Sequence, residues 1–67
     1  MDIETELALR AILRGLFHSN AIGADNVRAV GAALKDAAGA ALDRHNPDAA
    51  KALLALAKGI KTDTAVI

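Results

Sequence analysis

Apolar and polar residues alternate with the period of an α-helix in three segments of the chain. The first segment begins near Asp2 or Thr5 and ends near Phe17 or His18. Apolar residues spaced three and four apart form one arc of its helical wheel: Leu9, Ile12, Leu13, Leu16 and Phe17. Acidic residues lie in its opening turns and basic residues toward its end, and both arrangements complement the helix dipole. This segment is predicted to be an amphipathic helix.

The second segment begins near Ala24 or Asp25, ends near Arg44, and is rich in alanine, the strongest helix former. Its main face combines small and branched residues: Val27, Val30, Gly31, Leu34, Ala37, Ala38, Ala41 and Leu42. Polar residues occupy only a narrow strip. The glycines Gly31 and Gly39, together with Ala38, have a spacing typical of closely packed helices. We therefore expect this helix to contact neighbours on more than one side.

The third segment has the clearest start signal, Asn46-Pro47-Asp48. Asparagine is a good N-cap, proline suits the first helical position, and an acid meets the positive end of the dipole. The periodicity ends at Gly59 or Ile60. The breaks between helices are expected at Ser19–Ala24, where Asn20 and Gly23 favour a turn, and at 45–46. The sequence predicts an all-α fold: a three-helix domain over residues 1–61, followed by a tail at 62–67 that is flexible or docked on a partner.

Composition limits the size of the core that one copy can build. The chain has 67 residues, enough for one domain, and 54% of them are hydrophobic, but 17 of these are alanine. No cysteine is present to supply a disulfide. Chains this short commonly need an additional source of stability, and self-association is the simplest one left. We therefore predict a helical homo-oligomer, most simply a dimer.

The surplus apolar surface indicates where the second copy would contact the first. Ile3 and Leu7 lie on a different side of the first helix from its main apolar arc. A single small core has no room for both faces, and a contiguous exposed patch usually marks an interaction site. The predicted interface consists of Ile3, Leu7, Val30, Gly31, Leu34 and Ala38.

Candidate chemistry is sparse. His18 and His45, the only histidines, are interpreted as residues in the last turns of the first and second helices, because no third ligand stands at metal-binding spacing. The cluster of Glu4, Glu6, Arg10 and Arg14 is interpreted as a solvated face, with Glu6 and Arg10 as an i, i+4 pair. Ser19 has no identifiable base beside it. We therefore expect no enzyme activity, no metal site and no cofactor.

Charge and hydropathy narrow the class of partner. The formal net charge is zero, which argues against nucleic acid or a membrane surface as the partner. No apolar run reaches the length of a membrane span, and the acidic N-terminus does not resemble a leader, so we expect a cytoplasmic protein.

The function predicted from the sequence is that of a small interaction or assembly module that self-associates. An unidentified protein is a second partner that the sequence leaves open. The alternative is a small nucleic-acid-binding regulator whose basic surface forms only in the oligomer, from Arg10, Arg14, Lys51 and Lys58. The C-terminal residues 64–67 end in an apolar residue that a peptide-binding domain or a dimer partner could capture.

Overall fold

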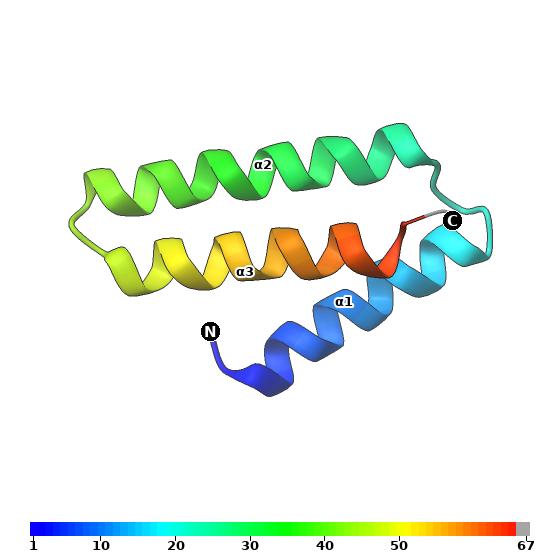
Figure 1. Ribbon diagram of the computed structural model, residues 1–67, viewed down its shortest axis with the longest axis horizontal. Helices are drawn as coiled ribbons and strands as arrows, with labels where there is room; N and C mark the ends of the chain where they lie inside the picture. The colour runs from blue at the N-terminus through cyan, green and yellow to red at the C-terminus, as the bar shows by residue number, and fades with distance from the viewer. Residues whose placement is uncertain (66–67) are drawn as a thin grey trace.

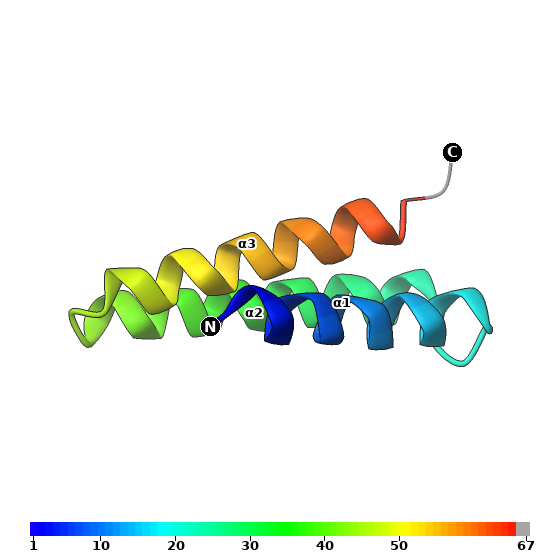
Figure 2. The same ribbon diagram turned by 90° about the horizontal axis from the view of Figure 1, so that it is seen from below.

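The computed structural model describes residues 1–65 and contains three α-helices in that range: α1 (Ile3–His18), α2 (Ala24–Asp43) and α3 (Pro47–Asp63). No strand occurs among these residues, which confirms the predicted all-α class. The helices α2 and α3 run antiparallel as a hairpin, and α1 lies against the side of α3 remote from α2 (Figure 1). Figure 2 shows that α3 is displaced toward one face of the molecule relative to α1 and α2. The molecule measures 38 × 24 × 19 Å.

The helix starts follow from side-chain caps. The Thr5 N–H donates to Asp2 Oδ1 at 2.7 Å, so α1 begins directly after Asp2. The Ala49 N–H donates to Asn46 Oδ1 at 3.2 Å, and Pro47 is the first residue of α3, as predicted.

The ends of α1 and α2 share one hydrogen-bond pattern. After α1, Asn20 adopts a φ of 65°, and the N–H groups of Asn20 and Ala21 donate to the carbonyls of Phe17 and Leu16. After α2, His45 adopts a φ of 59°, and His45 and Asn46 donate in the same way to Leu42 and Ala41. Both are Schellman motifs closed by a left-handed residue that is not glycine. His45 therefore lies two residues beyond the end of α2, and not within its last turn as predicted.

The helix α3 is longer than predicted. It continues beyond Ile60 to Asp63, and Thr64 caps it by donating from Oγ1 to the Ile60 carbonyl at 2.8 Å. Thr64 is buried, so residues 62–64 belong to the folded unit and not to a tail. Residues 66–67, the end of the predicted tail, lie outside the described residues. The sequence pattern missed this extension because its contacts come from outside α3.

The core lies mainly between α2 and α3 and is small. Five apolar residues among residues 1–65 are buried, and three of them are alanines: Ala38, Ala50, Leu56, Ala57 and Ile60. None is on α1, whose most enclosed apolar residues, Leu13 and Phe17, are only half-buried. Alanine buries little surface, so the hairpin of α2 and α3 rests on few large contacts.

A salt bridge fixes α1 against α3. The Arg10 guanidinium donates from Nε and one Nη to both carboxylate oxygens of Asp63, each at 2.8 Å. On the way it crosses Gly59, where an added Cβ would lie 2.7 Å from Arg10 Nε. We call this Arg10–Gly59–Asp63 arrangement the clamp. Arg10 therefore pairs with Asp63 and not with Glu6 as predicted. The planar guanidinium can donate two parallel hydrogen bonds to one carboxylate, and Asp63 accepts both.

The predicted close helix packing at Gly31 and Gly39 is wrong within one chain. An added Cβ at either glycine would meet nothing within 4 Å, whereas Gly59 is the glycine that a neighbouring side chain crosses. Backbone proximity at Gly31 or Gly39 would require a second molecule.

This contrast gives a matched pair of substitutions. Gly39→Ala is expected to raise the free energy of unfolding by about 0.5–1 kcal/mol, since alanine loses less backbone entropy in a helix. Gly59→Ala is expected to gain less or to destabilise, because its Cβ would displace the Arg10 guanidinium from Asp63. Urea denaturation followed by circular dichroism measures both. Equal gains at the two positions would show that Arg10 does not lie across Gly59.

Candidate functional site: an apolar groove with a basic rim

A groove of about 860 Å³ runs between α2 and α3, and Phe17 of α1 closes one end. Its floor is apolar and includes Val27, Gly31, Leu54, Ala57 and Ile60. Four cations stand along it, two from each helix: Arg28 and Lys35 from α2, and Lys58 and Lys61 from α3. None of the described residues that line the groove is acidic. We call this surface the basic groove.

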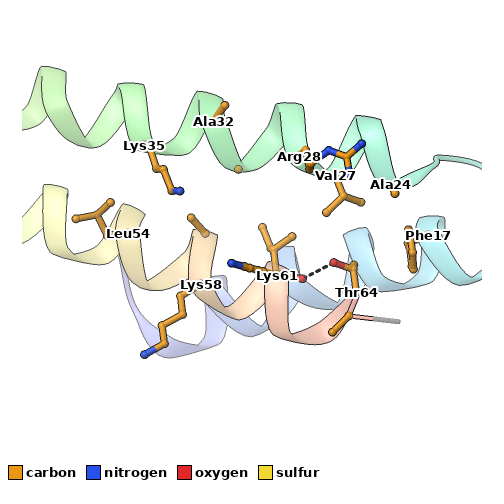
Figure 3. Close-up of a pocket in the computed structure, with 14 residues that line it drawn as sticks. Phe17, Ala24, Val27, Arg28, Ala32, Lys35, Leu54, Lys58, Lys61 and Thr64 are labelled. Atoms are coloured by element: carbon orange, nitrogen blue, oxygen red, sulfur yellow. Dashed lines mark hydrogen bonds between the residues drawn. The ribbon is translucent and has the colours of Figure 1, made fainter. Parts of the chain in front are cut away.

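The four cations differ in their surroundings. Arg28 pairs with Asp25 one turn earlier on α2. No ion pair involves Lys35, Lys58 or Lys61 within residues 1–65. In Figure 3, Lys35 extends from α2 toward α3, Lys61 lies over α3, and Lys58 points away from α2. The groove therefore carries uncompensated positive charge above an apolar floor.

The sequence analysis did not recognise this surface. The periodicity placed Lys35 and Lys58 on outward-facing polar positions, which is correct for each helix separately. A signal was present, however: none of the three lysines has an acidic residue at i±3 or i±4, the positions that would face it on a helix surface. The antiparallel pairing of α2 with α3 brings them along one groove.

A second surface of note is the apolar side of α1 left uncovered in the chain. Five large apolar side chains of this helix are exposed: Ile3 (62%), Leu7 (53%), Leu9 (40%), Ile12 (60%) and Leu16 (39%). Leu9, Ile12 and Leu16 share one flank, whereas Ile3 and Leu7 share another. The predicted apolar arc of α1 is thus divided, with Leu13 and Phe17 turned toward the hairpin and the rest toward solvent. We call Leu9, Ile12 and Leu16 the α1 strip.

The residues predicted for an interface between copies are placed in three different environments. Ile3 and Leu7 are exposed, and Gly31 lies in the floor of the basic groove. Val30 and Leu34 are half-buried on the face of α2 that carries Ala38, and Ala38 itself is only 2% exposed. Their participation in a dimer stays a prediction.

The side chains considered for chemistry do not converge on a site. His18 ends α1, with its ring edge-on to Phe17, and His45 closes the turn between α2 and α3. Among residues 1–65, no three His, Cys, Asp or Glu side chains gather as they would around a metal ion. Arg10 is held by Asp63, so it is not available to the basic patch that Arg14, Lys51 and Lys58 were predicted to share with it.

Within the described part of the chain, no helix has the length and apolarity needed to span a bilayer. Comparison of the sequence and structure with protein-family models, curated proteins and solved structures finds no match. Of the residues 64–67 whose capture was predicted, Thr64 is buried as the cap of α3, and positions 66–67 lie outside the described residues.

Proposed function

We propose that this protein is a helical assembly module that functions by associating with a second copy of itself. The observation that carries the proposal is the exposed apolar side of α1. Five large apolar side chains on one 16-residue helix face solvent, while none of the buried residues belongs to that helix. Three of the five, Leu9, Ile12 and Leu16, form one strip, and soluble proteins seldom leave an apolar patch uncovered unless it binds something.

The shape of the chain favours a copy of α1 as the covering surface. A helix with an apolar strip can pack antiparallel against an identical strip, and a two-fold axis then makes both copies contribute equally. The strip residues Leu9, Ile12 and Leu16 are spaced three and four apart, as a helix–helix contact requires. Ile3 and Leu7 lie on another flank of α1, across the side that faces the hairpin, so the α1 strip alone forms this contact.

The test is the mass of the particle in solution. Light scattering at high micromolar concentration is expected to give a multiple of the mass of one chain, 6.9 kDa. Ile12→Glu places a charge in the middle of the α1 strip and is expected to give single chains. Ala11→Glu, on the exposed back of the same helix, should leave the particle mass unchanged and is the matched control.

Two results would contradict this function. One is a single-chain mass for the unmodified protein at high micromolar concentration. The other is equal loss of association in Ile12→Glu and Ala11→Glu, which would show that net charge and not the α1 strip governs association. The nucleic-acid alternative stays a prediction, and its test is steep weakening of DNA binding with salt.

A further inference from the structure

The basic groove is a second surface, separate from the α1 strip. Its α3 side is formed by Leu54, Lys58 and Lys61, whereas α1 contacts α3 through Gly59 and Asp63 on another flank. The two surfaces can therefore be occupied independently. Leu54 remains 47% exposed in the groove, although it is a large apolar residue in an apolar setting.

Shape and length indicate what kind of ligand would fit the groove. Its α2 side extends from Ala24 to Lys35, which corresponds to three turns or about 16 Å of helix. Several floor positions are glycine or alanine, so the backbone of another helix can approach closely. An amphipathic helix that lays its apolar face into such a groove is a recurring mode of peptide recognition.

The positive charge of the groove indicates that its ligand is negatively charged. Lys35, Lys58 and Lys61 have no acidic partner within the described residues, and Arg28 adds a fourth cation along the same groove. The cations lie along both sides and at both ends, so they do not converge on one point. A ligand with a single carboxylate, such as a fatty acid, would leave most of them unpaired. A helix with acidic residues flanking its apolar face would meet all of them.

A second copy of this chain does not have the required charge pattern. The acidic residues of α1 occupy its first turns, at Glu4 and Glu6, and Arg10 and Arg14 follow. Three turns of α1 laid in the groove would place at least one arginine against the lysines. Like charges placed against one another at an interface disfavour it.

We propose that the basic groove binds an acidic amphipathic helix of a different partner protein. The apolar face of that helix, with anchors spaced i, i+4 and i+7, would lie on Val27 and Leu54 and against Phe17 at the end of the groove. Its flanking carboxylates would pair with Lys35, which extends from α2 toward α3, and with Lys61 on the α3 side of the groove (Figure 3).

The probe is a synthetic helix of about 16 residues, with leucine at i, i+4, i+7 and i+11, glutamate at the flanking positions and alanine elsewhere. Its control has the same leucines with lysine in place of every glutamate. Fluorescence anisotropy at low salt is expected to show at least tenfold tighter binding of the acidic peptide. The preference should weaken as salt is raised, because the rim charges are screened.

Substitutions inside and outside the groove test whether the acidic peptide binds there. Lys35→Glu and Lys61→Glu are each expected to weaken binding of the acidic peptide by about fivefold to tenfold. Lys51→Glu, a cation of α3 outside the groove, is the matched control. Gly31→Leu adds a large side chain to the groove at a position where a Cβ meets nothing within 4 Å, and should abolish binding. Gly39→Leu is equally unobstructed but lies outside the groove and should bind normally.

Repeating the titration in the Ile12→Glu background separates this test from the proposed self-association. Binding that survives in single chains supports the groove even if the assembly proposal fails. The inference is overturned if the acidic and basic peptides bind equally, if Gly31→Leu binds as Gly39→Leu does, or if dodecanoate or a DNA duplex binds more tightly than the acidic peptide.

Discussion

Replacement of Ala38 by glutamate is expected to unfold most of the chain at neutral pH. Ala38 is 2% exposed on the face of α2 that packs against α3, where a longer side chain has no space. Burying an unpaired carboxylate there costs several kcal/mol, and a small single core seldom supplies more than about 3–5 kcal/mol in total. The hairpin of α2 and α3 contains all five buried apolar residues, so its loss removes the core.

Far-UV circular dichroism and thermal melting measure this effect. Ala33→Glu, the same substitution at an exposed position of α2, is the control and should retain the helical signal. If Ala38→Glu melts like Ala33→Glu, the packing of α2 against α3 is not as described. Since Ala38 is buried within one chain, its loss reports on the intrachain core, whereas Ile12→Glu reports on association.

Breaking the clamp is expected to release α1 while the hairpin of α2 and α3 stays folded. The hydrogen bonds from Arg10 hold the pKa of the Asp63 carboxyl below its ordinary value of 3.8, and they raise the pKa of Arg10. Because the pKa of Asp63 is lower in the folded chain, its stabilisation is complete above about pH 4 and is lost as the pH falls through the folded value. Acidification below about pH 4 should therefore loosen α1.

Charge reversal tests the same contact at neutral pH. Arg10→Glu and Asp63→Arg each place like charges together and should remove hydrogen-exchange protection from residues 3–18, with little change in α3. The double variant restores opposite charges and is expected to recover part of the protection. Asp2 also has a lowered pKa from its cap to Thr5, so Asp2→Asn serves as the control for acid effects at the helix start. Additive losses in the double variant would show that Arg10 and Asp63 are not coupled.

Local signals in the sequence predicted the helices well, because caps act over three or four residues. Asp2 and Asn46 each accept from an N–H three residues later, and the helices begin within a residue of these caps. The end of α3 was missed for the opposite reason. Asp63 is anchored by Arg10, 53 residues away, and no local pattern records such a contact.

The basic groove was missed for a related reason. A helical wheel treats each helix alone, and on its own wheel Lys35 or Lys61 is an ordinary solvent-facing cation. Their relation depends on the antiparallel register of α2 and α3, which the tight turn after Asp43 establishes. The division of the α1 apolar arc likewise depends on which side of α1 faces the hairpin. Arg10 settles this by reaching across Gly59.

The clamp also has a consequence for the order in which contacts form as the chain folds. The α2–α3 hairpin closes over a three-residue turn, but the clamp needs Asp63, close to the C-terminal end of α3. Loop closure across a longer stretch is entropically less favourable, so the hairpin contacts form more readily than the clamp. The first helix of the chain is thus the last to be secured. Until the clamp closes, Leu13 and Phe17, which the hairpin half-covers in the folded chain, face solvent together with the α1 strip.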